Sequence, residues 1–475
     1  MKNKIASLRQ WAVLSTAVST ILITQINHAA PKLDLTLSAH STTKVKTLLN
    51  NPQTWKQIPK QVSLCIYSPN GANGEAFDQA TSYISELPRI AQVAKGFGVN
   101  MNITRPSKLQ MKIDLDYPKL KQKASTEVNL KVYTDERVLT EDFRSKRCDG
   151  AGISNIRARQ FNKFVGSIDA IGAVQNYKQL TQVIQLLARP EFDSKMVNRD
   201  YEVVGIVPLG AAYIMVNDRR IDTLPKAAGK KVAVMGFDAT QKKLVQNVGA
   251  QPVTVDLTSV GGKFNNREVD IMAAPAILFD PLELHKGMQD KSGKVVGAII
   301  RFPLVQVTGT LIMHRNKFPA GMGPIAREMI SKQLTPAFQF VDKMEKDIPE
   351  KYWMDIREAE KPGYLKIMRE ARIQMTKEGY YDPAMMSILK KSRCSQYPSN
   401  FELSGADKKF YPAVAVVEKN GTIKLSSKAV KNPVAVRYCF NSDDMPDLFD
   451  QNGLPLLPFR TDNWDNVLSS KAKNK

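Results

Sequence analysis

The sequence predicts an α/β protein with two lobes and an additional β-containing region at its C-terminus. Strand-like apolar runs alternate with helical patterns over most of the chain, which is typical of open, largely parallel sheets covered by helices. The 475 residues are enough for two or three domains with buried cores. Residues 395–475 instead carry short strands separated by turns, which indicates a distinct extension.

The first half of the chain opens with a polar lead-in at residues 31–60 that shows no strong periodicity. The run QVSLCIY at 61–67 is the first strong strand, and apolar residues at helical spacing predict a helix over 76–96. Residues 98–125 are rich in lysine, and we expect an irregular insertion there. Further strands are predicted at 127–133 and 149–154, with a short helix at 137–146 between them.

The second half continues the same alternation. Its predicted strands are 201–207, 211–216, 231–235, 251–256, 268–273, 295–301 and 304–314, with a helix at 238–248. Its later helices are predicted at 323–345, 349–359, 362–379 and 383–392. In the extension, Asn420-Gly421 predicts a hairpin turn between strands 411–417 and 422–425, and a further strand follows at 432–440.

The elements divide the chain into five expected segments. They are a signal peptide at 1–30, the lead-in at 31–60, lobe one with crossing helices at 61–205 and 304–394, lobe two at 206–303, and the C-terminal extension at 395–475. The chain crosses between the lobes near residues 205–216 and 300–309, and these crossings are the expected hinge.

The N-terminus predicts export by a cleavable signal peptide. Lys2, Lys4 and Arg9 precede a mostly apolar run at 11–26, and small residues follow at Ala29 and Ala30. A retained membrane anchor is the weaker alternative, because the run is short for a span of about 20 apolar residues and is diluted by hydroxyls. The expected location is therefore the periplasm.

The net charge is strongly positive, at +22 for the full chain and +19 without the three cations of the signal segment. The cations occur singly or in pairs, which is typical of a solvated basic surface. An exported protein meets little nucleic acid, so the charge favours anionic ligands over a nucleic-acid partner.

Motifs for catalysis are missing from the sequence. It contains no GxSxG elbow, no GxxxxGK[ST] phosphate loop and no HExxH. His40, His285 and His314 are far apart, and no CxxC is present, so no metal site or cofactor is expected. The sequence therefore predicts a binding protein rather than an enzyme.

A ligand site is expected in the crevice at the carboxyl ends of the parallel strands, where helix N-termini and loop amides converge. The loops placed there are 68–73, 154–159 and 236–240. Arginines at 157, 159 and 301 could supply a guanidinium for a carboxylate. The candidate ligand-binding residues in these loops are Ser68, Asn70, Ser154, Arg157, Phe237 and Asp238. Tyr213, near the expected hinge, is a further candidate.

The stretch from Pro208 to Met288 resembles the solute-binding subunits of tripartite ATP-independent periplasmic (TRAP) transporters. The similarity lies in GIVPLGAAYIMVND, LPKAAGKKVAV, QKKLVQNVGAQPVTVDL and EVDIMA. This resemblance implies a two-lobed, type II periplasmic-binding-protein fold. It also implies a function: capture of a small polar solute, anionic if the charge of the chain reflects its ligand, and delivery to a membrane permease.

The sequence departs from this family at one position that matters for the ligand. Members usually carry an arginine in the strand that follows the Gly-Lys segment, and Ala233 stands there in this chain. The insertion and the C-terminal extension also have no counterpart. The alternative is an envelope binding or scaffold protein on the same fold without a transport role.

Four cysteines allow three pairings in an oxidising compartment. The strand order implied by the resemblance places Cys65 beside Cys148. We therefore expect a Cys65–Cys148 disulfide, and a Cys394–Cys439 disulfide within the C-terminal region.

Overall fold

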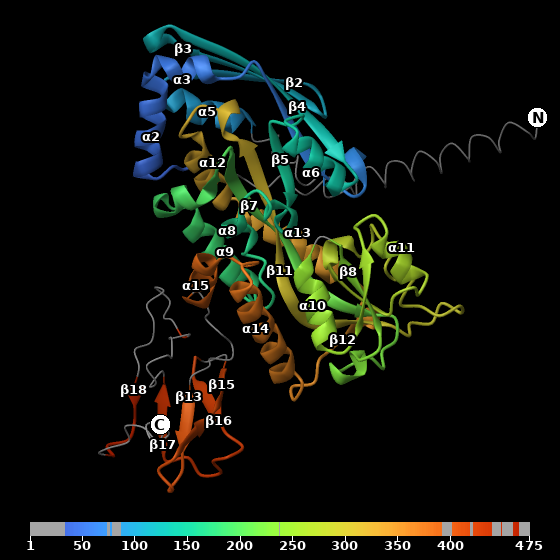
Figure 1. The fold of residues 1–475 in the computed structure, drawn as a ribbon. Coiled ribbons are helices and arrows are strands. Elements are labelled where there is room, and N and C mark those ends of the chain that lie inside the picture. Colours follow the sequence, from blue (N-terminus) through green and yellow to red (C-terminus); the bar gives the residue numbers. More distant parts are fainter. Residues whose placement is uncertain are drawn as a thin grey trace, which may run out of the picture.

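One sheet of twelve strands runs through both lobes (Figure 1). The computed structural model describes residues 34–73, 77, 87–236, 238–391, 401–418, 421–438, 448 and 459–464. The sheet order is β2 (Asn100–Ser107), β3 (Gln110–Tyr117), β4 (Gln122–Tyr133), β1 (Gln61–Tyr67), β5 (Gly150–Ser154), β11 (Ala298–His314), β7 (Tyr201–Val216), β10 (Ile271–Pro275), β8 (Lys231–Met235) and β9 (Gln251–Val255). Two short strands complete it, β6 (Val197–Asn198) on β7 and β12 (Trp353–Met354) on β11.

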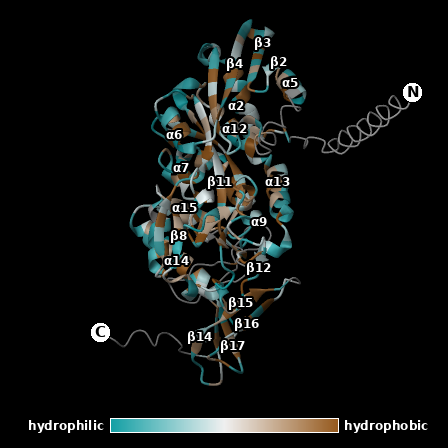
Figure 2. Ribbon diagram, turned by 90° about the vertical axis from the view of Figure 1, so that its right-hand side faces the viewer, coloured by the Kyte–Doolittle hydropathy of each residue, from teal (hydrophilic) through white to brown (hydrophobic). Residues whose placement is uncertain are grey.

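The two ends of this sheet form the two lobes, and parallel pairing occurs in each, as the alternation predicted. In lobe one, β1 is parallel to β4 and β5, and in lobe two, β8 is parallel to β9 and β10. Helices cover the strands, and Figure 2 shows hydrophilic residues along surface helices such as α6 (Glu136–Arg144). Strands in parallel sheets need this cover because crossover connections place helices on their faces.

Other helices contribute apolar residues to the cores of the two lobes or complete the fold. Those that contribute residues to the lobe-one core include α9 (Tyr177–Leu187) and α15 (Pro383–Lys391), and α11 (Val260–Asn265) contributes to the core of lobe two. The others are α5 (Leu87–Gly96), α7 (Asn155–Ala158), α8 (Lys163–Gly166), α10 (Ala239–Asn247), α12 (Met322–Ser331), α13 (Leu334–Asp347) and α14 (Lys361–Lys377).

Two long antiparallel strands, β7 and β11, connect the lobes. They pair along their whole length, and β5 and β10 flank them at the two ends. The prediction of two separate strands in place of each was wrong. The turn-like Pro208-Leu209-Gly210 stays inside β7 because Gly210 adopts a φ of +101°, and register shifts near Pro303 and Thr308 let β11 continue as a bulged strand.

Three other sequence expectations also fail. The lead-in forms two helices, α2 (Ala39–Asn50) and α3 (Pro52–Gln57), whose N-termini are capped by Ser38 and Asn51. The insertion is a regular antiparallel ribbon of β2 and β3 on β4. Residues 349–359 contain a 3-10 turn and β12 instead of an α-helix.

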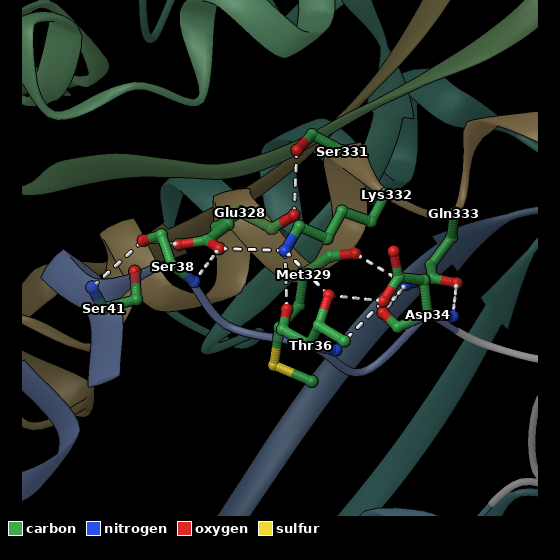
Figure 3. Close-up of polar contacts among 9 residues, drawn as sticks. All are labelled: Asp34, Thr36, Ser38, Ser41, Glu328, Met329, Ser331, Lys332 and Gln333. Atoms are coloured by element: carbon green, nitrogen blue, oxygen red, sulfur yellow. Dashed lines mark hydrogen bonds and ion pairs between the residues drawn. The ribbon is translucent and has the colours of Figure 1, made fainter.

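Polar contacts fix the lead-in to α12 (Figure 3). The amide of Ser38 donates to Glu328 Oε1 at 2.6 Å, and its hydroxyl donates to Oε2 at 2.8 Å. Lys332 Nζ lies 3.1 Å from Glu328 Oε1 and donates to the carbonyl of Thr36 at 2.6 Å. A segment that the sequence left without structure is therefore attached to lobe one by charged hydrogen bonds.

The C-terminal region is built from short antiparallel strands. Its two sheets consist of β13 (Phe401–Ser404), β14 (Phe410–Pro412), β17 (Ala435–Tyr438) and β18 (Phe459–Arg460), and of the hairpin β15 (Val414–Val417) and β16 (Ile423–Ser426). Phe401, Ala415 and Tyr438 form a small core. The predicted hairpin and the later strand are confirmed.

Cys65 and Cys148 form the expected disulfide, with 5.8 Å between their Cα atoms. Cys394, Cys439 and the signal segment lie outside the described residues. No helix among the residues that the structure describes is long and apolar enough to cross a membrane.

Candidate functional site

A cavity of about 170 Å³ lies between the lobes, and residues of both lobes and of the two connecting strands line it. Lobe one contributes residues of α7 and of the loop after α8, including Arg159 and Asp169. Lobe two contributes residues of β8 and α10, and β7, β11 and α14 supply apolar side chains. An apolar lining with a few converging polar groups is the usual composition of a small-molecule site.

Arg159 is the cation of this cavity. Its Nε donates to the carbonyl of Gly166 at 3.0 Å, and its guanidinium lies 4.2 Å from the ring centre of Tyr380 and 5.3 Å from that of Tyr381. Gly166 is needed for this approach, because a Cβ there would lie 2.4 Å from Arg159 Cα. The buried Nη1 has no hydrogen-bond partner among the described residues, so this donor is available to a ligand.

Asp169 is a buried carboxylate beneath the cavity. It accepts hydrogen bonds from the amide of Thr308 at 3.0 Å, from the Thr308 hydroxyl at 2.5 Å and from Asn155 Nδ2 at 3.1 Å. Burial raises the pKa of Asp169 to about 6, although these hydrogen bonds and the nearby Arg159 favour the ionised form. The network joins α7 to β11 and thereby fixes the helix that carries Arg159.

Asp238, one of the residues proposed from the sequence, lines the cavity from lobe two. It caps α10 through the amide of Gln241 at 3.4 Å and accepts a hydrogen bond from the Tyr380 hydroxyl at 2.7 Å. Tyr380 also stacks on Arg159, so one tyrosine contacts polar groups of both lobes. Ala233 of β8 lines the same cavity, at the position where the resembling family carries its arginine.

Ser154 and Arg157 gather around a different group, the buried Glu136. Both the amide and the hydroxyl of Ser154 donate to Glu136, the latter at 3.0 Å, and Arg157 Nε lies 3.8 Å from Glu136 Oε2. Burial raises the pKa of Glu136, against the effect of Ser154 and Arg157. These two predicted residues thus form a structural cluster at the start of α7.

The remaining predicted residues are spread over three places. The Ser68 hydroxyl donates to the carbonyl of Gly71 at 2.8 Å in the turn after β1, where Asn70 is exposed. Tyr213 packs edge-on against Trp353, with ring centres 5.1 Å apart, and burial together with Glu345 raises its pKa. Phe237 lies outside the described residues.

Sequence reasoning missed Asp169 and Tyr380 and ranked Arg157 above Arg159. One signal pointed to Asp169, because it is the single charged residue between Lys163 and Lys178 in an otherwise apolar stretch. A lone acid in such a stretch is usually buried with partners. No comparable signal marks Tyr380.

The fold and this interlobe site define a two-lobed solute-binding protein. Two solved TRAP periplasmic solute-binding proteins share the fold at a TM-score of 0.51 each, one from Desulfovibrio salexigens with bound orotic acid and one from Haemophilus influenzae RdAW with bound L-gulonate. They are 10% and 11% identical to this chain, over 70% of it, and the similarity spans 98% and 100% of the two proteins.

The chain belongs to the AdeT 1/2 family of solute-binding proteins, whose family model matches residues 18–408. It is 49% identical to the probable solute-binding protein AdeT1 of Acinetobacter baumannii over 337 residues, which cover 71% of this chain and 98% of the relative. It is 30% identical to the probable solute-binding protein AdeT2 of the same organism over 238 residues, 50% of this chain and 98% of the relative. The class is one of binding proteins, not of enzymes.

Proposed function

We propose that the protein captures a small organic anion between its lobes in the periplasm, with Arg159 as the anchor of the anionic group. The observation that carries this proposal is Arg159, which lines the interlobe cavity and whose buried Nη1 has no hydrogen-bond partner among the described residues. Leaving a buried donor unpaired is costly, and a ligand oxygen would remove that cost. A guanidinium from α7 would then replace the arginine that Ala233 does not supply.

Ligand entry requires the lobes to separate. The cavity, at about 170 Å³, is smaller than the roughly 300 Å³ at the lower end of small-molecule sites. The hinge we propose is the pair of crossings near residues 205–216 and 300–309, between lobe one (61–205 and 304–394) and lobe two (206–303). Contacts of the ligand with Arg159 on one side and with a lobe-two residue such as Gln241 on the other would favour the closed state when a ligand is present.

Delivery to a membrane permease is the transport role that this class of protein serves, and we propose it for this chain together with cleavage of the signal peptide. A scaffold role without a ligand is the second candidate function. Two features favour it: the presence of Ala233 where the resembling family usually carries an arginine, and the small volume of the cavity.

The test is a thermal-shift screen with orotate, L-gulonate and other small carboxylates, each paired with its uncharged amide. A carboxylate at 100 times its dissociation constant should stabilise the folded protein by about 2.7 kcal/mol and raise its melting temperature by a few degrees. Arg159→Ala should lose this shift, because it removes the only cation that lines the cavity among the described residues.

Arg157→Ala is the matched control, two residues away on the same helix. It should lower the melting temperature of the unliganded protein, since it leaves Glu136 buried without its cation, and it should keep the ligand-induced shift. A shift lost with Arg157→Ala but kept with Arg159→Ala would reassign the anchor. No shift with any carboxylate would favour the scaffold role.

A further inference from the structure

A second and larger cavity, of about 570 Å³, lies inside lobe one and away from the interlobe site. Its floor is the face of the sheet that bears Leu64 and Leu311, opposite to the face that carries Cys65 and the main core. Its walls include Leu48 of α2, Trp55 of α3 and Met322 of α12. The volume falls within the range of about 300–1,000 Å³ that is usual for small-molecule sites.

The chemistry of this cavity is almost entirely apolar. None of the described residues that line it is charged. Two of its few polar groups are already satisfied within the protein, since Trp55 Nε1 donates to the carbonyl of Leu49 at 2.9 Å and Thr126 Oγ1 to that of Pro59 at 2.8 Å. The cavity therefore offers few partners to hold ordered water.

An apolar cavity of this volume favours binding of an apolar ligand. Protein interiors are packed as closely as organic crystals, and the cost of an unfilled cavity grows with its volume. A dry apolar cavity of about 150 Å³ in another protein binds benzene. Leu64 and Leu311 are only half-buried although helices cover this face of the sheet, so their side chains are accessible to a ligand.

Two exposed cations are next in sequence to residues of the cavity wall. Lys56 and Lys60 directly follow the lining residues Trp55 and Pro59, and both are exposed. Neither forms an ion pair with a described residue. An apolar interior with unpaired ammonium groups beside it complements an amphiphile with a negative head.

We propose that lobe one binds a free fatty acid, with its acyl chain in this cavity and its carboxylate near Lys56 and Lys60. The site is separate from the interlobe cavity and does not depend on a ligand there. The fatty acid would be a second ligand, distinct from the polar solute of the interlobe cavity.

The probe is cis-parinaric acid, a fluorescent fatty acid whose emission increases in apolar surroundings. Titration into the full mature chain should give saturable binding of one molecule per chain. Leu311→Trp should weaken binding by at least about tenfold, because the larger side chain occupies volume that the acyl chain needs. Val434→Trp is the matched control, since Val434 is 62% exposed in the C-terminal region, and its titration should equal that of the wild type.

A second variant keeps the proposal testable if Leu311→Trp fails to fold. Reversing the charge of the two exposed lysines (Lys56→Glu and Lys60→Glu) should weaken binding of parinaric acid severalfold and leave binding of its uncharged methyl ester unchanged. Arg159→Ala should not change either titration.

Three results would overturn the proposal. They are the absence of saturable binding, equal affinity in Leu311→Trp and wild type, and loss of binding in Arg159→Ala, which would place the probe between the lobes. Sedimentation with anionic phospholipid vesicles distinguishes the source of the acyl chain. Binding to vesicles without binding of the soluble acid would point to a membrane surface and contradict a free fatty acid.

Discussion

At the scale of single residues, the structure separates two arginines that the sequence presents as equivalent. Arg157 lies beside the buried Glu136, whereas Arg159 stacks on Tyr380 and lines the interlobe cavity. Charge alone does not make an anion site. The guanidinium that lines the cavity, away from a buried carboxylate such as Glu136, is the one positioned to take a ligand oxygen.

Asp169 gives a prediction at the same scale, on pH. Its pKa is about 6 in the folded protein, against about 3.9 for an unperturbed aspartate, so the folded state holds the proton more tightly. The free energy of unfolding should therefore fall as the pH rises from about 4 to 6, by about 3 kcal/mol from this group. Asp169→Asn should remove this contribution, which urea denaturation at pH 4.5, 5.5 and 6.5 would measure.

A control for Asp169→Asn is the same substitution at a carboxylate that is not buried. Asp347→Asn, on the exposed side of α13, should leave the pH dependence of the wild type in place. A profile for Asp169→Asn that runs parallel to the wild type would show that Asp169 is ionised throughout this range.

At the scale of elements, the two connecting strands and the lead-in helices show how local patterns are overridden by packing. Pro208-Leu209-Gly210 reads as a turn, yet β7 continues through it because β11 pairs along its whole length. The lead-in has weak periodicity of its own, and α2 forms against α12 with a capping serine and a charged partner (Figure 3).

Glu328 carries the prediction for this attachment. Burial opposes its ionisation, but hydrogen bonds from Ser41 and Ser38 and the ammonium of Lys332 outweigh that effect and lower its pKa to about 2. The attachment should therefore be complete above pH 4.5 and weaken as the pH falls toward 2. Glu328→Ala should destabilise the docked α2 by about 1 kcal/mol, since the carboxylate lies close to solvent.

Hydrogen exchange of the α2 amides would measure this change, with faster exchange expected in Glu328→Ala at neutral pH. Glu370→Ala removes an exposed carboxylate from α14 and should not alter exchange in α2. Unchanged protection of α2 in Glu328→Ala would show that apolar contacts alone hold the helix.

At the scale of the whole molecule, the Cys65–Cys148 disulfide ties β1 to the start of β5 across 83 residues of sequence. In the chain-entropy account, closing a loop of this length stabilises the folded state by about 4 kcal/mol. The double variant Cys65→Ala, Cys148→Ala should lose roughly that amount in urea denaturation under non-reducing conditions. Equal stability of the variant and the wild type would contradict a constraining role for this bond.

The sequence by itself determined the alternation of strands and helices, the two-lobed class and, with the help of a family resemblance, the Cys65–Cys148 pair. These follow from local periodicity and from the rule that the carboxyl ends of parallel strands meet at one edge. The pairing of Cys394 with Cys439 stays a prediction.

Only the tertiary structure decided which arginine meets the cavity, which buried acid supports it and where apolar space remains. Arg157 and Arg159 are two residues apart and so point about 200° apart around a helix, and the rotation of α7 against its neighbours decides between them. That rotation depends on Asn155, Asp169 and Thr308, which are distant in sequence and meet only in the folded chain. Volume is likewise a property of all the walls together, so no local pattern could reveal either cavity.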